Sequence, residues 1–336
     1  MSARQYGLPV SITVSGTGVH LPDTVVTNRM LEETLETSDE WIVRRTGIRE
    51  RRWLAPERAT SDMGIAAARS ALQAAGMPAS DVDAIVVSTY TYDQPLPSTA
   101  LIIKDALGAP RALPFDVTQA ACAGGVQAML LAAHLLQSPA METVLVIAAD
   151  CASRVTDPRD RVTRIFFGDA AAAAVVTRAA SGSGAGLLSW DYGSQLSYDV
   201  EIQAGGSRVP PSAATIADRR HYLRMDGRAV WNTATANLPE SIANAARRAQ
   251  LPIGEITHFF LHQANLNILT ETMTHLGVPM DRAPVTLDKL GNTGAAGMFT
   301  ALHQTFAQGR LKPGDTYILS AIGAGFQWGT LCFRHA

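Results

Sequence analysis

The sequence predicts a layered α/β domain built from two similar halves. Short β-branched runs alternate with alanine-rich segments of helical period, a pattern typical of strands that alternate with helices. Both halves of the 336-residue chain show this alternation in the same order. A shift of about 170 residues aligns the two patterns, and self-similarity over that range indicates an internal repeat.

The first half contains three expected strands and two expected helices. The strands are the buried runs at 82–89, 113–117 and 143–148, and the helices span 99–107 and 124–136. Gly108 and Pro110 end the first helix, since glycine favours a helix C-terminus and proline cannot continue one.

The second half repeats this order. Strands are expected at 256–261, 283–287 and 316–320, and helices at 268–276 and 294–306, with Gly277 and Pro279 ending the first of them. A turn of small residues leads into a helix at 121–125 and again at 291–295. Ordinary α/β proteins also look repetitive, but here strand order, helix lengths and breakers agree. We therefore expect duplicated halves at 1–180 and 181–336.

The segment 182–230 between these patterns is less regular. Gly205, Gly206, Pro210 and Pro211 interrupt it. Glycine and proline at this density mark a loop excursion, and loops on a rigid scaffold often carry function. We expect this segment to line a substrate entrance.

Composition restricts the class of protein. The chain is 47% hydrophobic and 17% charged with a net charge of −2, so neither nucleic acid nor an anionic membrane is an expected partner. Three cysteines are too few for a disulfide framework and are not spaced as metal ligands. No leader is evident at 1–11, and apolar runs such as 170–176 are far shorter than the roughly 20 residues of a membrane span. We expect a soluble, cytoplasmic protein without a metal.

Cys122 is the first candidate for chemistry. It follows an expected strand, opens an expected helix and has small neighbours. A helix N-terminus lowers the pKa of a thiol there, and its N–H groups can hold a developing oxyanion. A lone cysteine is more commonly an inert buried residue. Cys151 and Cys332 lie within or beside expected strands, so that inert interpretation suffices for them.

Two further residues stand where a partner of the thiol is expected. His262 follows a buried strand directly, at the edge where α/β sheets place functional side chains. Asn292 lies in a glycine-bounded turn that opens a helix, a position that a capping asparagine also occupies. The other seven histidines lack such a setting.

These residues stand in motifs that resemble those of the β-ketoacyl-acyl-carrier-protein synthase III family, condensing enzymes of the thiolase superfamily. The resemblance covers nearly the whole chain, in the order of the family. Its motifs are TSDEWIVRRTGIRERR at 37–52, ACAGG at 121–125, DRVTRIFFGDAAAAAVV at 160–176, MDGRAV at 225–230, HQAN at 262–265, GNTGAAG at 291–297 and GAGFQWG at 323–329.

The resemblance implies a five-layered α-β-α-β-α thiolase-type fold, a homodimer and a decarboxylative condensation. Cys122 matches the nucleophile that carries the acyl group. His262 and Asn292 match the pair that assists decarboxylation, where neutral donors stabilise the enolate oxygen. The backbone N–H groups of Cys122 and Ala324 match the oxyanion site.

The resemblance also implies the substrates. Coenzyme A thioesters and an acyl carrier protein are the expected partners, and no permanently bound cofactor is expected. Trp41 and Arg161 match the residues that sandwich the adenine, as suits an aromatic ring and a guanidinium. Thr37 and Arg45 match groups near the nucleotide; Gly227 and Asn265 match groups near the pantetheine. Leu96 and Phe167 are expected at the acyl pocket.

Several positions depart from the family pattern. Asn267 replaces a basic residue, which puts carrier docking in doubt. Leu96 replaces a phenylalanine that the partner subunit contributes, which suggests longer, branched or unusual acyl groups. The run GDGAG is GDAAA at 168–172, and the stretch 115–122 is one residue longer than usual. These changes indicate a specialised relative, for example in a polyketide pathway.

Two rival functions follow. A related enzyme can move an acyl group from the cysteine to an alcohol or amine without forming a carbon–carbon bond, but Asn292 favours condensation because simple transfer has no enolate to stabilise. A silent binding partner would lack the nucleophile, which is present. Arg44, Arg49, Arg51 and Arg52 are interpreted as a solvated basic face that can attract an anionic carrier.

Overall fold

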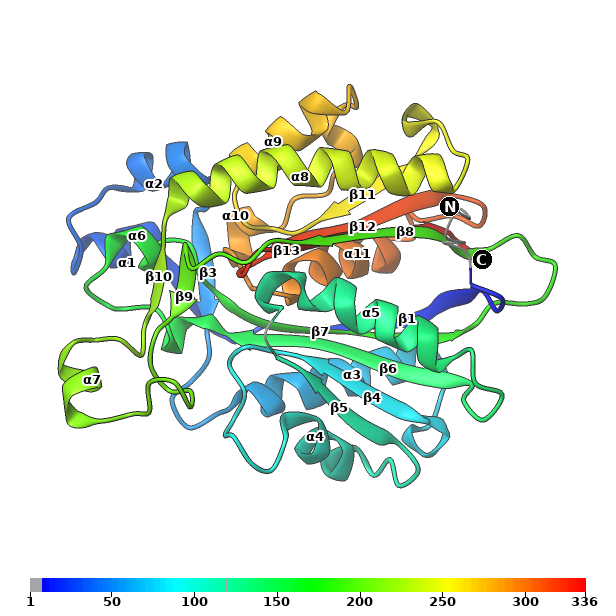
Figure 1. Cartoon of the computed structure of the whole chain (residues 1–336), viewed down its shortest axis with the longest axis horizontal. Coiled ribbons are helices and arrows are strands. Elements are labelled where there is room, and N and C mark those ends of the chain that lie inside the picture. Colours follow the sequence, from blue (N-terminus) through cyan, green and yellow to red (C-terminus); the bar gives the residue numbers. More distant parts are fainter. Residues whose placement is uncertain (1–7, 119) are drawn as a thin grey trace.

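The computed structural model describes residues 8–118 and 120–336. Two sheets alternate with three layers of helices, so that the order is α-β-α-β-α (Figure 1). One outer layer contains α3 (Thr60–Ala74) and α4 (Thr99–Leu107), and the other contains α8 (Gly227–Arg248) and α9 (Leu266–His275). Between the sheets lie α5 (Gly124–Leu135) and α11 (Ala296–Ala307). This is the five-layered arrangement expected.

The two sheets repeat one topology. The first has the order β1-β7-β6-β4-β5 and the second the order β8-β13-β12-β11. In each, the first three strands are antiparallel neighbours and those that follow are parallel. The strands of the first sheet are β1 (Ile12–His20), β4 (Ala84–Ser88), β5 (Leu113–Val117), β6 (Thr143–Cys151) and β7 (Asp169–Arg178). Those of the second are β8 (Gly186–Ser194), β11 (His258–Leu261), β12 (Thr316–Gly323) and β13 (Gln327–Arg334).

The remaining helices and strands are shorter. They are β2 (Thr24–Thr27), α1 (Asn28–Glu32), α2 (Asp39–Thr46), β3 (Glu50–Trp53), α6 (Arg161–Arg164), β9 (Val200–Ile202), α7 (Ala213–Ala217), β10 (Leu223–Met225) and α10 (Leu287–Leu290). Single 3₁₀ turns occur at η1 (Ala79–Asp81), η2 (Ala121–Ala123), η3 (Ala152–Arg154), η4 (Ile253–Glu255) and η5 (Met280–Arg282). No helix in the described part of the chain is both long and apolar enough to span a bilayer.

Small residues bring the layers close together. A Cβ atom on Gly16 or Gly18 of β1 would lie 2.6 Å from the carbonyl oxygen of Ala71 or 2.3 Å from that of Ala67. Both carbonyls belong to α3, so this helix packs directly on the strand backbone. The alanine run of β7 is buried throughout, although alanine has low strand propensity. Tertiary packing therefore decides its conformation.

The expected strand at 283–287 is wrong. Residues 284–286 have no regular secondary structure, and α10 begins at Leu287. Side chains take the place of a backbone ladder beside β11. The Gln263 amide donates to the carbonyls of Leu261 and Pro284 at 2.9 and 3.2 Å and accepts from the Thr286 N–H at 2.9 Å. A strand pattern does not form because these side-chain bonds satisfy the backbone instead.

The interpretation of Arg51 as part of a solvated basic face is also wrong. Arg51 is fully buried, and its guanidinium donates to Ile165 O, Asn28 Oδ1 and Val26 O at 2.6, 2.7 and 3.3 Å. Burial lowers its pKa to about 10, so it stays charged at neutral pH. Arg44 and Arg49 are exposed as expected, and Arg52 is partly buried.

Arg51→Met should destabilise the fold, because it leaves three buried acceptors without donors. Each unsatisfied group costs about 1–3 kcal/mol, so we expect a loss of at least about 3 kcal/mol in urea unfolding. Arg49→Met, at an exposed position, should change stability by less than about 0.5 kcal/mol. Equal stability of the two variants would contradict this role.

Candidate active site

Cys122 lies at the carboxyl end of the first sheet, after β5, in the turn η2 that opens α5. Ala121 has a φ of 45°, a left-handed conformation that turns the chain sharply before the thiol. A Cβ on Gly323 would lie 3.0 Å from the Cys122 backbone nitrogen and 2.2 Å from Ala120 O. Glycine at this position lets the turn between β12 and β13 pack closely against the η2 turn that contains Cys122. The extra residue expected within 115–122 cannot be placed, since Gln119 lies outside the described residues.

Two cavities meet at Cys122. One, of about 110 Å³, also contains His262 and Asn292 in its lining, with Gly227 and Asn265 farther along. The other, of about 340 Å³, is lined by Tyr90, Ile202 and Leu223 among others. Cys122, Phe167 and Ala324 line both cavities. The structure thus brings the three expected catalytic residues, the expected oxyanion position Ala324 and the expected pocket residue Phe167 together.

Asn292 is held by its neighbours in a single orientation. Its N–H donates to Phe166 O at 2.7 Å, and its carbonyl accepts from Gly168 N at 3.0 Å. Its side-chain Oδ1 accepts from the Gly294 N–H at 3.0 Å. These bonds leave the Nδ2 hydrogens as the donors that Asn292 offers to the cavity.

His262 offers a neutral ring to the same cavity. Its backbone N–H donates to Ser320 O at 2.8 Å, and its side chain is only 4% exposed. Nδ1 is buried and has no hydrogen-bond partner among the described residues. Burial lowers the pKa of His262 to about 4, so at neutral pH the imidazole is uncharged, with one N–H donor and one acceptor nitrogen.

This burial links stability to pH. Because the pKa of His262 falls from 6.5 unfolded to about 4 folded, the unfolded chain binds a proton that the folded protein excludes. Stability should therefore fall as pH decreases from about 6.5 to about 4, by roughly 3 kcal/mol from this residue. His262→Gln should lessen that acid loss in urea titrations at pH 7 and pH 4.5. His134→Gln, at an exposed position, should leave the loss of stability at acid pH unchanged. Equal losses in the two variants would contradict the assignment of this effect to His262.

The expectation that the helix start lowers the pKa of Cys122 is wrong for the resting enzyme. Burial raises the pKa of the thiol, and nearby Asp150 raises it further. The thiol is therefore protonated beside a neutral imidazole. Its proton must leave as the thiol attacks, and an imidazole can accept it.

Asp150 was missed by sequence reasoning. It is the penultimate residue of the buried strand β6, and its carboxylate is fully buried. It accepts from Tyr90 N at 3.0 Å, Thr89 Oγ1 at 3.2 Å and Ala295 N at 2.9 Å. One carboxylate thus ties the first half to the turn that carries Asn292. An acidic residue at the end of a run of apolar strand residues was the available signal. Burial raises the pKa of Asp150 to about 7.

The residues expected around coenzyme A gather on α2 and its neighbours. The guanidinium carbons of Arg161 and Arg45 lie 5.3 and 5.5 Å from the centre of the Trp41 ring. The Thr37 hydroxyl is buried without a hydrogen-bond partner in the described part of the chain. Asn265 caps α9 and donates to Arg45 O at 3.2 Å. Gly227 opens α8.

Asn267, at the family's basic position, has a local structural use. Its Nδ2 donates to Arg45 O at 2.9 Å and so helps to fix α9 on the end of α2. Leu96 lines neither of the two cavities. It lies on the surface with 85% of its area exposed, so a single chain does not bring it to its own acyl pocket.

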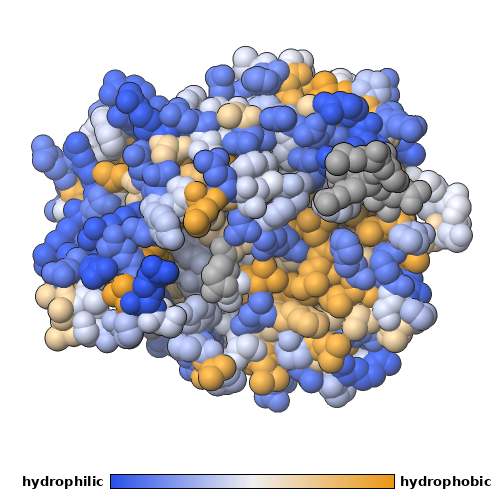
Figure 2. Space-filling view, in the orientation of Figure 1, coloured by the Kyte–Doolittle hydropathy of each residue, from blue (hydrophilic) through white to orange (hydrophobic). Residues whose placement is uncertain are grey.

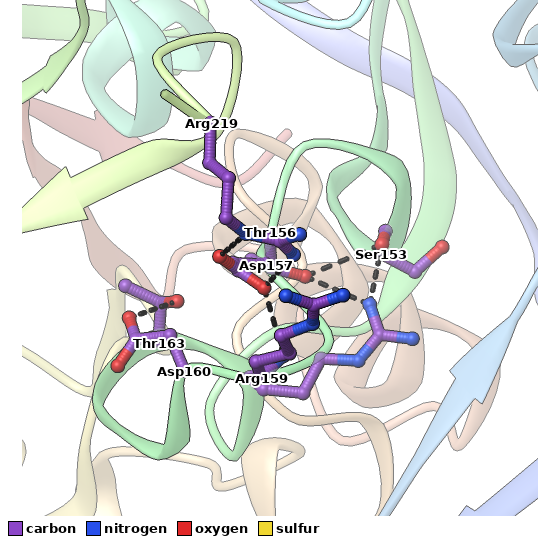
Figure 3. A network of polar contacts seen from close by, with 8 residues as sticks. Ser153, Thr156, Asp157, Arg159, Asp160, Thr163 and Arg219 are labelled. Carbon is purple, nitrogen blue, oxygen red and sulfur yellow. Dashed lines mark hydrogen bonds and ion pairs between the residues drawn. The ribbon is translucent and has the colours of Figure 1, made fainter. Parts of the chain in front are cut away.

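A loop network holds the wall of the larger cavity. Figure 3 shows Arg219 reaching Asp157, whose Oδ1 also accepts from the Arg159 N–H at 2.8 Å. Leu223, on β10, donates its N–H to Val155 O at 2.7 Å. The segment from β9 to β10, which includes the expected excursion with Gly205 and Gly206, is thereby anchored as part of the cavity lining.

The described residues contain no group of three or more His, Cys, Asp or Glu side chains placed to hold a metal ion.

Comparisons with known proteins agree with this geometry. Residues 115–195 match the family model for 3-oxoacyl-acyl-carrier-protein synthase III, and residues 246–335 match that for its C-terminal part. The chain is 38% identical to β-ketoacyl-acyl-carrier-protein synthase III of Symbiobacterium thermophilum, over 97% of this chain and 98% of the relative.

Solved structures are similar over nearly the whole length. The 3-oxoacyl-acyl-carrier-protein synthase III of Aquifex aeolicus superposes with a TM-score of 0.89 at 33% identity, covering 96% of this chain and 100% of that one. The priming β-ketosynthase of the R1128 polyketide pathway gives 0.89 at 30% identity, covering 98% of each chain. This chain belongs to the β-ketoacyl-acyl-carrier-protein synthase III family of condensing enzymes in the thiolase superfamily.

Proposed function

We propose that Cys122 accepts an acyl group from an acyl-CoA or acyl carrier protein, and that His262 and Asn292 then direct its condensation with a malonyl-type thioester. The observation that carries this proposal is the shared cavity. Cys122, His262 and Asn292 line it together, and none of the described residues in its lining is charged. Neutral donors suit an enolate, whereas a carboxylate would repel it.

The first half-reaction loads the enzyme. The Cys122 sulfur attacks the thioester carbonyl while the thiol proton passes to the neutral His262. The N–H groups of Cys122 and Ala324 hold the oxyanion, and coenzyme A leaves as its thiol after taking up a proton.

The second half-reaction forms the carbon–carbon bond. The malonyl thioester loses CO2, its enolate oxygen is held by His262 and Asn292, and the enolate carbon attacks the Cys122 thioester. Cys122 leaves as the thiolate and regains a proton, which releases a β-ketoacyl product.

Sequential addition of substrates tests the scheme. After mixing with an acyl-CoA, intact-protein mass spectrometry should show one adduct on Cys122. Later addition of malonyl carrier protein should release CO2 and a β-ketoacyl product in equal amounts. No adduct would support a silent binding protein, and an ester or amide formed without CO2 would support acyl transfer to an alcohol or amine.

Coenzyme A is proposed to bind along α2, with its adenine between Trp41 and Arg161. The two side chains already face each other, and a planar base between them requires only that they separate. Thr37 and Arg45 would lie near the nucleotide, and Gly227 and Asn265 near the pantetheine. The exposed Arg44 and Arg49 support docking of an anionic carrier protein at the same end.

Trp41→Ala should raise KM for acyl-CoA about tenfold through loss of stacking, with little change for an acyl-pantetheine donor that lacks the nucleotide. Arg44→Ala, an exposed position on the same helix, should leave KM for acyl-CoA nearly unchanged. An equal loss with both donors in Trp41→Ala would contradict adenine stacking.

A homodimer is proposed on the face that contains the edge strand β5. Figure 2 shows hydrophobic residues gathered over α5, β5 and α4, where Leu101 and Leu113 are both more than 40% exposed. Pairing of this edge and burial of this face would cover them. Leu96 would then be free to reach the partner's acyl pocket.

The remaining finer assignments are also proposals. Repetition of strand order between the sheets supports division of the chain into halves 1–180 and 181–336. Three free cysteines fit the cytoplasm. The changes at Leu96, Asn267 and GDAAA support a specialised role, for example in a polyketide pathway.

A further inference from the structure

We propose that Gln127, Tyr192 and Gln327 are positioning residues that hold the N–H group of Ala324 in place beside that of Cys122. This inference rests on the proposed acylation of Cys122, because it concerns the two N–H groups assigned to the oxyanion of that step. It begins from three polar side chains that come from both halves of the chain and bond to one another.

The three side chains form a closed ring of hydrogen bonds. The Gln127 amide donates from Nε2 to Tyr192 Oη at 2.5 Å and to Gln327 Oε1 at 2.6 Å, and the Tyr192 hydroxyl donates to Gln327 Oε1 at 2.7 Å. Both amide hydrogens of Gln127 therefore have an acceptor. Burial raises the pKa of Tyr192, so the hydroxyl keeps the proton that it donates. All three side chains are half-buried, and linked hydrogen bonds away from bulk water strengthen one another.

Gln327 stands at the base of the turn that carries Ala324. It opens β13, and its backbone pairs with that of Gly323 at the end of β12. The three-residue turn between these two residues begins with Ala324. The Gln195 N–H donates to Phe326 O at 2.8 Å, which fastens the same turn to the chain after β8. These backbone contacts hold the turn within the second half of the molecule.

Gln127 connects this turn to the helix that follows the nucleophile. It lies on α5, which begins directly after the η2 turn that contains Cys122. The ring of hydrogen bonds thus joins the half that supplies Cys122 to the half that supplies Ala324. The two N–H groups must point at one oxygen atom, so a link between their supporting elements acts on the geometry of the oxyanion site.

Glycine lets the elements around the ring approach closely. Gly329 on β13 pairs with Tyr192 on β8. A Cβ atom on Gly329 would lie 2.8 Å from Tyr192 Cδ2 and 2.9 Å from Val126 Cγ1. The space that this glycine leaves is therefore filled by the tyrosine ring and by a side chain of α5. Groups fixed by packing as well as by hydrogen bonds are positioned precisely, and a displacement of about 1 Å in a reacting site can slow a reaction about 100-fold.

Two substitutions that nearly preserve side-chain size test the proposal in the full-length protein. Tyr192→Phe removes the hydroxyl, and Gln127→Met removes the amide. Each should lower the maximal rate of Cys122 acylation by butanoyl-CoA at least about tenfold, while KM changes by less than about threefold. Alkylation of Cys122 by iodoacetamide should keep the wild-type rate, because that reaction forms no oxyanion. Tyr198→Phe, at an exposed position outside both cavities, should keep both rates.

The double variant distinguishes a ring from independent contacts. Either substitution opens the ring, so Gln127→Met combined with Tyr192→Phe should be within about twofold of the slower single variant.

Three outcomes would overturn the inference. They are acylation at the wild-type rate in both single variants, equal slowing of acylation and alkylation, which would indicate only a structural role, and losses that multiply in the double variant. Failure of butanoyl-CoA and other acyl-CoA substrates to modify Cys122 in the wild-type protein would instead contradict the proposed function itself.

Discussion

Cys122→Ala should reduce acyl loading by at least about 10⁴-fold, because loss of a covalent nucleophile removes the pathway and leaves only binding. Cys122 sits where both cavities meet, and the alanine side chain is smaller, so the cavity and fold should persist. Intact-protein mass spectrometry after mixing with acyl-CoA measures the loss, and an unchanged thermal unfolding midpoint shows that the fold is kept.

The other two thiols provide an internal control. Cys151 and Cys332 are buried in β6 and β13, and peptide mapping should find no acyl group on either. An adduct that persists in Cys122→Ala and maps to another residue would show that the nucleophile is wrongly assigned.

Asn292→Asp should lower decarboxylation of the malonyl thioester by about 10²–10³-fold while acylation of Cys122 changes by less than about threefold. The substitution is nearly isosteric. The oxygen that accepts from Gly294 N is kept, and only the Nδ2 donor is replaced by a second oxygen. The enolate would therefore meet a repelling lone pair where it now meets a hydrogen. Release of CO2 from radiolabelled malonyl carrier protein measures this step.

Asn244→Asp is the matched control, since Asn244 lies on α8 far from both cavity linings and accepts from Arg247 at 2.9 Å through the oxygen that aspartate keeps. It should retain both half-reactions. Survival of decarboxylation in Asn292→Asp would contradict the role of Asn292. Equal loss of acylation and decarboxylation would show that the substitution had damaged the site as a whole.

The repeat made two of the three proposed catalytic positions predictable. Cys122 and Asn292 occupy equivalent turns before α5 and α11, and His262 directly follows β11. Parallel strands bring their carboxyl ends to one edge of a sheet, so residues at strand ends and helix starts converge even when they are far apart in sequence.

What the sequence could not predict depends on tertiary environment. Arg51 stands in a run of arginines yet is buried, because the acceptors from Val26, Asn28 and Ile165 come from distant segments. The pKa of Cys122 rises because burial and Asp150 outweigh the helix start that sequence reasoning considered. Exposure and neighbours of this kind are properties of the assembled fold.

The side-chain bonds beside β11 also affect how copies of the protein can meet. The Gln263 amide and the Arg282 guanidinium, which donates to Gly254 O and Ile256 O at 2.7 and 3.1 Å, fasten the segment 282–287 along that border. A second copy therefore finds no bare strand there to extend. Strand addition at β11 as well as at β5 would build an open-ended filament, whereas the covered border beside β11 restricts the proposed pairing to β5 and limits growth to a closed pair. Gln263→Ala should consequently promote higher oligomers rather than simple dissociation.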